Sequence, residues 1–145
     1  MNYLNAFRIS ASGMTAQRLR MNIATTNLAN INTTRTQGGG PYRRKDVVFE
    51  SKSLPGSFGN ALQSSMSGKL AGVQVSEIIE DPRPPISKHD PQHPDADNKG
   101  YIQVPRINLM EEMVNMMSAT RSYEANVTAI KATKDMALKA LEIGR

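Results

Sequence analysis

A long stripe of apolar residues near the C-terminal end constrains the fold more than any other feature of this sequence. Ten positions follow alternating spacings of four and three residues, and eight of them are apolar: Leu109, Met113, Met116, Thr120, Tyr123, Val127, Ile130, Lys134, Ala137 and Leu141. This spacing predicts a coiled-coil-like helix over 109–143, about 52 Å long at 1.5 Å per residue. A compact protein of 145 residues does not require so long a helix, so we expect it to pack against partner subunits.

The residues around the start of this stripe support a helix beginning there. Asn108 is a good N-cap residue, and Glu111 and Glu112 lie where the helix dipole favours acids. At the other end, Gly144 is suited to closing the helix. We therefore expect the helix to run from about 109 to 143.

Residues 4–28 predict a second amphipathic helix with two apolar stripes. The first repeats every seven residues, and its alternate slots are apolar until Arg18 and Thr25 interrupt them; its members are Leu4, Phe7, Ala11, Met14, Met21 and Leu28. The second stripe, Ile9, Ala16 and Ile23, has the same period on another face. Two seams on one helix indicate two neighbours. An Asn- and Thr-rich segment after Asn27 predicts the helix end, because these residues favour caps and turns.

The middle of the chain predicts little regular structure. Short strands are expected around Val47–Phe49, at 73–79 and at 101–104, which make at most a small sheet. Residues 51–72 are rich in Ser and Gly and predict a loop. Residues 81–100 hold five of the eight prolines, which exclude a regular helix or a central strand.

Three regions follow from this pattern, and the expected fold class is mainly α. Residues 1–35 form the N-terminal helix and its exit, residues 36–105 a small β and irregular middle domain, and residues 106–145 the C-terminal helix. The apolar residues are concentrated near the two ends, which is unusual for a globule with one shared core. This distribution favours a non-enzymatic building block whose core is completed by partners.

Charge and composition exclude several classes of protein. Residues 1–45 contain seven Lys and Arg and no acid, whereas the other hundred residues carry a net charge of −2. A nucleic-acid-binding surface would be more uniformly basic. Cysteine is absent, which excludes disulfides, thiol nucleophiles and Cys-ligated metals. No apolar run reaches the roughly 20 residues of a membrane span, and no secretory signal is visible.

Candidate sites for chemistry are weak. His89 and His93 are four residues apart, but prolines forbid the helix that would align them, and residues 95–100 imitate an EF-hand loop without its later oxygen ligands. A structured turn is the preferred interpretation. The glycines at 38–40 lack the rest of a phosphate loop. Residues 43–45 (Arg-Arg-Lys) could contact phosphate or an acidic partner, although a solvated edge is the favoured reading. We therefore predict no catalytic residue, metal or cofactor.

Two rival classes remain open at this point. A basic helical nucleic-acid-binding protein would show salt-dependent DNA affinity, but the basic third contains few aromatic residues. A metal-dependent enzyme built on His89 and His93 would lose activity on exchange of both. Neither reading explains the two helices.

Four segments of the chain together resemble a known family. They are Ser12-Gly13-Met14 with Arg20-Met21-Asn22 and Asn27-Leu28-Ala29-Asn30-Ile31-Asn32-Thr33; Asp81-Pro82 with His93-Pro94-Asp95-Ala96-Asp97 and Gly100-Tyr101; Glu112-Met113-Val114 with Arg121-Ser122-Tyr123-Glu124-Ala125-Asn126-Val127; and Lys134-Asp135-Met136-Ala137-Leu138 with Leu141. The first is similar to the N-terminal signature of flagellar rod, hook and hook-associated axial proteins. The others, with the short length, resemble the proximal rod proteins among them. Arg106 departs from the pattern, where Asn is expected.

The resemblance implies a structural subunit of the bacterial flagellar basal body. In that family the terminal helices pair within a subunit, as an antiparallel coiled-coil-like pair, and pack into a helical tube with the middle domain outside. The tube transmits torque and encloses an export channel across the periplasm. Implied partners are copies of the chain, other proximal rod proteins, the distal rod protein, the export-gate or MS-ring adaptor protein, and the flagellar type III export apparatus, which needs no cleaved signal peptide. Nucleic acid and membrane insertion are not implied.

The two apolar stripes supply the predicted assembly interface. Its members are Leu4, Phe7, Ala11, Met14, Met21, Leu28, Leu109, Met113, Met116, Tyr123, Val127, Ile130, Ala137 and Leu141.

Overall fold

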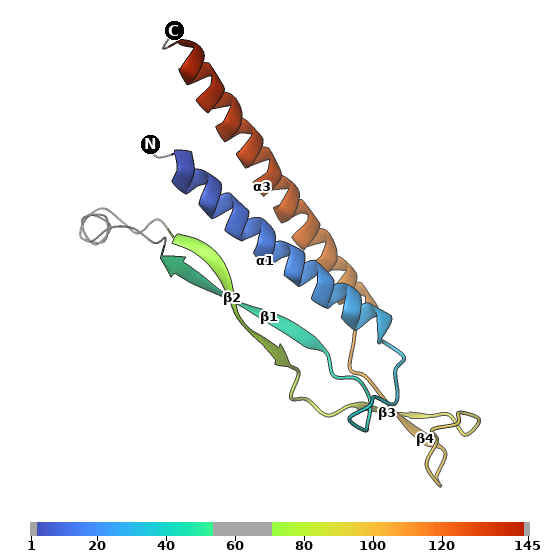
Figure 1. Ribbon diagram of the computed structural model, residues 1–145. Coiled ribbons are helices and arrows are strands. Elements are labelled where there is room, and N and C mark those ends of the chain that lie inside the picture. Colours follow the sequence, from blue (N-terminus) through green and yellow to red (C-terminus); the bar gives the residue numbers. More distant parts are fainter. Residues whose placement is uncertain (1–2, 54–70, 144–145) are drawn as a thin grey trace.

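Two long helices lie side by side and run in opposite directions in the computed structural model, which describes residues 3–53 and 71–143 (Figure 1). Helix α1 spans Tyr3–Ala29 and helix α3 spans Leu109–Ile143. Both chain ends lie at the same end of the pair. The predicted mainly α fold, with an antiparallel helix pair and a small strand-containing middle region, is confirmed.

The start of α3 follows the local rules for a helix N-terminus. The Asn108 side-chain oxygen accepts a hydrogen bond from the Met110 amide at 3.0 Å, and its carbonyl accepts from the Glu112 amide at 3.1 Å. Glu111 and Glu112 occupy the first turn, where carboxylates are stabilised by the helix dipole. The N-cap at Asn108 was therefore correctly predicted, whereas Gly144 lies outside the described residues.

The two helices approach each other closely because their contacting residues are small. Ala16 and Ala24 of α1 and Ala119 of α3 are buried. A Cβ atom placed on Gly13 would lie 3.1 Å from the side-chain nitrogen and oxygen of Asn126. The backbones of α1 and α3 lie close together, so no large side chains interlock between them. The large apolar side chains of both helices therefore lie outside the fully buried seam.

A long β-hairpin packs along α1. Strand β1 (Lys45–Ser53) pairs antiparallel with strand β2 (Ala71–Glu80), with an irregularity in the register between Val48 and Phe49. Both strands contact α1, and the hairpin lies on the side of α1 away from α3 (Figure 1). The loop predicted over 51–72 is wrong at both margins, because the ladder includes Ser53 paired with Ala71; the rest of it lies outside the described residues.

A second, shorter hairpin joins a strand that was missed in the proline-rich segment to the strand that was correctly predicted at 101–104. Strand β3 (Ile86–His89) pairs antiparallel with strand β4 (Tyr101–Val104) in a separate two-stranded sheet. The prolines exclude a central strand, but β3 has one partner and occupies the four residues between Pro85 and Asp90 that contain no proline. Edge strands tolerate flanking prolines. Proline does exclude a central strand, but the prediction wrongly extended this rule to a short edge strand.

Candidate assembly interface

One end of the helix pair is joined to the hairpin through the side chain of Asn27, which is 1% exposed. Its Nδ2 donates to the Lys45 carbonyl at 2.8 Å and to Oε2 of Glu112 at 3.0 Å. Its Oδ1 accepts from the Lys45 amide at 2.9 Å and the Tyr42 hydroxyl at 3.1 Å. All the hydrogen-bonding capacity of this amide is used, so Asn27 fixes α1 against both β1 and α3.

Glu112 completes this arrangement from α3. Its side chain is 2% exposed, and its Oε1 accepts from Nε of Arg44 at 2.7 Å. Arg44 also contacts Asp46 at 3.1 Å and Glu111 at 3.8 Å. Partial burial works against the charged form of Arg44, but the hydrogen bonds and charges of Glu112 and Asp46 together outweigh it and raise the pKa of Arg44. We call Asn27, Tyr42, Arg44 and Glu112 the polar cluster.

The sequence interpretation of residues 43–45 was wrong for Arg44. Neither a solvated edge nor a phosphate contact describes an arginine side chain that is only 13% exposed and is paired with the buried Glu112. Tyr42, just before this basic run, has its pKa raised by burial and by the charges of Glu80 and Glu112. The position of Glu112 was a usable signal, because an acid on the buried side of a helix requires a cation or a hydrogen-bond donor beside it. The sequence alone could not show that this partner is Arg44.

Two adjacent residues of the Ser12-Gly13-Met14 motif face different neighbours. Ser12 Oγ donates to the Ile9 carbonyl at 2.7 Å and accepts from the Val73 amide of β2 at 3.0 Å. A Cβ atom on Gly72 would lie 2.8 Å from that same oxygen, so a larger residue there would displace the Ser12 hydroxyl from its present position. Gly13 admits the Asn126 side chain on the α3 side. The motif therefore joins α1 to the hairpin and to α3 at the same level.

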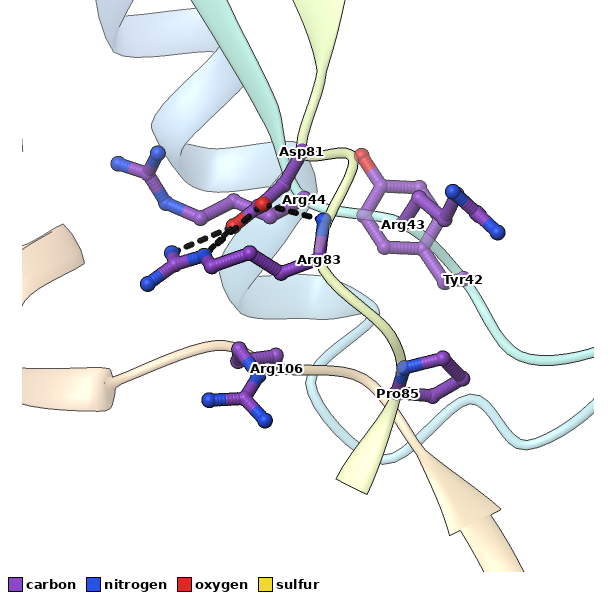
Figure 2. Close-up of a pocket in the computed structure, with 7 residues that line it drawn as sticks. All are labelled: Tyr42, Arg43, Arg44, Asp81, Arg83, Pro85 and Arg106. Carbon is purple, nitrogen blue, oxygen red and sulfur yellow. Dashed lines mark hydrogen bonds and ion pairs between the residues drawn. The ribbon is translucent and has the colours of Figure 1, made fainter. Parts of the chain in front are cut away.

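A small basic notch lies where β2 leads into β3, beside the polar cluster. Figure 2 shows Asp81 in its centre, bound by Arg83, with Arg44 nearby. These contacts lower the pKa of Asp81 to about 2, first through the side-chain hydrogen bond from Arg83 and then through its backbone amide. Arg106 donates to the Pro84 carbonyl at 3.2 Å. The notch holds about 10 Å³, which is about the space of one water molecule.

The histidine-containing loop between β3 and β4 is a hydrogen-bonded turn. His93 Nδ1 accepts from the Asp95 amide at 3.1 Å, and the His89 ring packs edge-on against Tyr101. Asp97 Oδ1 accepts from the amides of Lys99 and Tyr101, and these bonds, with that of Tyr101 first, lower its pKa. Among the described residues no group of three acids or histidines is placed to hold a metal ion. The Asp97 carboxylate orders the backbone of the turn, and the Asp95 carboxylate accepts a hydrogen bond from the Thr34 hydroxyl at 2.7 Å.

The structure distributes the predicted interface residues between the flanks of the helix pair and its outer surface. Half-buried members are Phe7, Met14, Met21, Leu28, Met116, Tyr123, Val127, Ile130 and Ala137. Exposed members are Leu4, Ala11, Leu109, Met113 and Leu141. The innermost seam of α3 consists of other residues that recur every seven positions: Glu112, Ala119, Asn126 and Thr133. Sequence reasoning missed this seam because its members are small or polar, although their spacing was a usable signal.

Comparison with known families fits this architecture at both ends of the chain. Residues 7–37 match the family described as "Flagella basal body rod protein". Residues 98–143 match the family described as "Flagellar basal body rod FlgEFG protein C-terminal". These matches cover most of α1 with the segment that follows it, and β4 with α3. The class defined by the fold and these matches is a structural subunit of the bacterial flagellar basal-body rod.

Individual relatives identify the member of that class. The FlgC rod protein of Bacillus subtilis (strain 168) is 49% identical over 152 residues, covering 100% of both chains. Those of Borreliella burgdorferi and Escherichia coli O6:H1 are each 41% identical, covering 99% and 100% of this chain and 98% and 100% of their own. The chain belongs to the FlgC family of flagellar basal-body rod proteins. In the described part, no helix has the length and apolar character needed to cross a membrane.

Proposed function

We propose that the terminal helices of this chain pack against copies of itself and against other rod proteins to form a helical tube that transmits torque and encloses the export channel. The observation that carries the proposal is the small apolar core of the subunit. Among the described residues, the buried aliphatic side chains besides Pro105 are Ala16, Ala24, Ile102 and Ala119. The larger apolar side chains of the helix pair, such as Phe7 and Val127, are only half-buried, so much of the apolar surface that could stabilise so long a pair remains exposed to water in the single subunit.

Apolar side chains suited to such contacts are exposed along α3. Met110 is 66% exposed, Val114 60% and Leu141 72%. Complete burial of side chains of this size contributes about 1.5–3 kcal/mol each. Partner subunits that cover them would supply the stabilisation that the isolated subunit lacks, and contacts that do not close on themselves generate helical assemblies.

Each region of the chain has its own role in this assembly. Residues 1–35 and 106–145 act as the helical core domain of the rod, and residues 36–105 as a middle domain carried outside it. The further partners are the distal rod protein and the export-gate or MS-ring adaptor protein. Delivery is by the flagellar type III export apparatus into the rod that crosses the periplasm. We also propose that both ends of the free subunit are disordered and fold on assembly.

A pair of variants on the outer surface of α3 tests the assembly function. Val114→Asp places a charge on an exposed apolar position, whereas Ser118→Asp places the same charge one turn further along at an exposed polar position. We expect Val114→Asp to be exported but absent from purified basal bodies, with loss of swimming, because a desolvated carboxylate is costly. The Ser118→Asp control should swim. Normal basal bodies containing the Val114→Asp chain would refute the proposal.

Circular dichroism of the dilute subunit tests the folding step. We expect much less helix in the free chain than α1 and α3 would give, with helicity gained on assembly. Full helicity, together with protected amides in both helices of the dilute monomer, would rule out folding on assembly.

A further inference from the structure

The hairpin of β1 and β2 contains almost no buried residues of its own. Gly72 is the one residue of these two strands that is buried. Five apolar side chains of the hairpin are between 37% and 44% exposed: Val48, Phe49, Val73, Ile78 and Ile79. Of the other helices and strands in the described part of the chain, only α1 contacts the hairpin. A two-stranded hairpin without further support is marginally stable at best in water, so the stability of this hairpin depends on α1.

The C-terminal part of α1 meets the edge of β1 through one side chain. Nδ2 of Asn27 donates to the Lys45 carbonyl at 2.8 Å, and Oδ1 accepts from the Lys45 amide at 2.9 Å. A residue of a neighbouring antiparallel strand makes the same two bonds in a hydrogen-bonded pair. The backbone groups of Lys45 therefore point out of the ladder with β2, and the Asn27 side chain lies where a third strand would lie.

The N-terminal part of α1 meets the edge of the other strand. The Val73 amide of β2 donates to Oγ of Ser12 at 3.0 Å, so it also points out of the ladder. The strands of a two-stranded ribbon twist strongly, and the edge that meets α1 changes from β2 near Ser12 to β1 near Asn27 (Figure 1). Ser12 and Asn27 are 15 residues apart, or about 22 Å along a helix. Both contacts form together only when α1 is helical between them.

We propose that α1 takes the place of a third strand beside the hairpin, so that the hairpin is ordered only when α1 is helical. In a subunit whose α1 is disordered, Lys45 and Val73 lose their partners on α1. The consequence for assembly rests on the folding of the chain ends proposed above: incorporation into the rod then orders the hairpin as well as the helices. The order of the middle domain is thereby coupled to the packing of the helical core domain.

The alternative is that Ser12 and Asn27 only fix where an independently folded hairpin lies. The two cases differ at amides that are bonded within the ladder. Val73 is opposite Ser51, and its amide points out of the ladder. The adjacent pair, Glu50 and Gln74, is therefore a hydrogen-bonded pair, because the two kinds of pair alternate. Exchange of the Glu50 and Gln74 amides reports whether the hairpin itself is formed.

Hydrogen exchange of the unmodified full-length chain tests the coupling. We expect the Glu50 and Gln74 amides to be protected in isolated basal bodies and to exchange at nearly the intrinsic rate in the dilute free chain, where circular dichroism should show little helix. Protection of both amides in a free chain without helix would overturn the proposal and leave the assembly function intact. A free chain with both helices formed would refute folding on assembly, and a Ser12 variant then decides the coupling in that chain. Absence of the unmodified chain from basal bodies would instead defeat the assembly function itself.

The variant Ser12→Ala removes one of the two contacts and leaves the sequence of the hairpin unchanged. We expect protection of the Glu50 and Gln74 amides to fall about two- to tenfold, which corresponds to one hydrogen bond. Thr15→Ala is the matched control, because the Thr15 hydroxyl bonds to the Ala11 carbonyl of its own helix, and it should leave this protection unchanged. A change confined to the Val73 amide would show that Ser12 only positions the hairpin and would overturn the proposal.

Discussion

At one end of the helix pair the Asn27 side chain makes four hydrogen bonds, whereas at the other end Leu141 and Ile143 are largely exposed. The first, which we call the closed end, is held by the polar cluster and joins three elements. The second, the open end, consists of residues 138–143 at the end of α3 together with the start of α1, where Leu4 is exposed.

The two ends therefore differ in role: one sets how the helices of a subunit pair, and the other is available for contacts with neighbouring subunits. Buried polar groups with defined partners tolerate few alternative registers, since a shift would leave them unsatisfied. Burial of exposed apolar side chains is favourable but does not depend on direction, so a neighbouring subunit can cover them in more than one arrangement. We infer that the closed end fixes the register of α1 against α3 and that the open end is left for assembly.

The largest effect is expected from Glu112→Ala at the closed end. Removing the carboxylate leaves Nε of Arg44 and one amide hydrogen of Asn27 without their acceptor, and breaking a buried ion pair costs about 3–5 kcal/mol. We expect the variant to be lost from isolated basal bodies under mild heating that retains the unmodified chain, as measured by immunoblotting.

Glu111→Ala is the matched control for that variant. Glu111 is adjacent and exposed, and it contacts the same arginine at 3.8 Å, so its removal should change stability by no more than about 1 kcal/mol. Equal losses for the two variants would mean that the polar cluster does not distinguish the closed end.

The next effect is expected between the two ends, at Ala119, whose side chain is fully buried. Ala119→Leu overfills the small-residue seam, and overpacking of this kind costs about 1–3 kcal/mol. We expect less of the variant in basal bodies and a smaller swimming halo in soft agar. Ala125→Leu, at an exposed position on the same helix, should have the smaller effect; the reverse order would contradict a seam closed by small residues.

A smaller effect is expected where the hairpin meets α1. Ser12→Ala removes the acceptor of the Val73 amide, and a single hydrogen bond contributes about 0.5–1.5 kcal/mol. We expect faster hydrogen exchange at the Val73 amide in the assembled protein. Thr15→Ala is a suitable control, because that hydroxyl bonds only its own helix at Ala11. Unchanged protection at Val73 would show that Ser12 does not hold the hairpin.

How far the sequence predicts this fold depends on the kind of signal. Periodic apolar residues and the Asn108 cap predicted α3 with its observed bounds and α1 to within one residue at either end. Both signals are local, because period and capping depend on residues within a few positions. Strand β3 was missed since proline position, rather than proline content, decides whether a short edge strand forms.

The candidate site was less predictable because its contacts join distant parts of the chain. Arg44 and Glu112 are 68 positions apart, and nothing near Arg44 indicates that an acid lies opposite it. The apolar stripe predicted that the large residues of α3 form an assembly interface, which stays a prediction, and it gave no indication of the seam with α1. The seam is made of small and polar residues, which a search for periodic apolar residues does not detect.

The smallest effect concerns Asp81 in the notch beside Arg44. Its folded pKa is lowered from 3.8 to about 2 by Arg83. A carboxyl group with a depressed folded pKa stabilises the fold above its unfolded pKa, and this contribution is lost as pH falls. The loss should therefore occur between pH 3.8 and about 2. Because the pairing residue Arg83 is largely exposed, solvent screens the pair and the change is small.

Asp81→Asn tests this, because the amide cannot ionise. In the unmodified chain the Arg83 amide donates to Asp81 at 3.0 Å, so its protection from hydrogen exchange, corrected for the intrinsic rate, should fall across that pH interval. In Asp81→Asn it should be lower at neutral pH and nearly independent of pH. The contact joins residues two positions apart, so it should persist in the free subunit, where the two ends of the helix pair need not be assembled. An identical acid response in both proteins would assign the transition to another carboxyl group and would leave Asp81 without a role at the closed end.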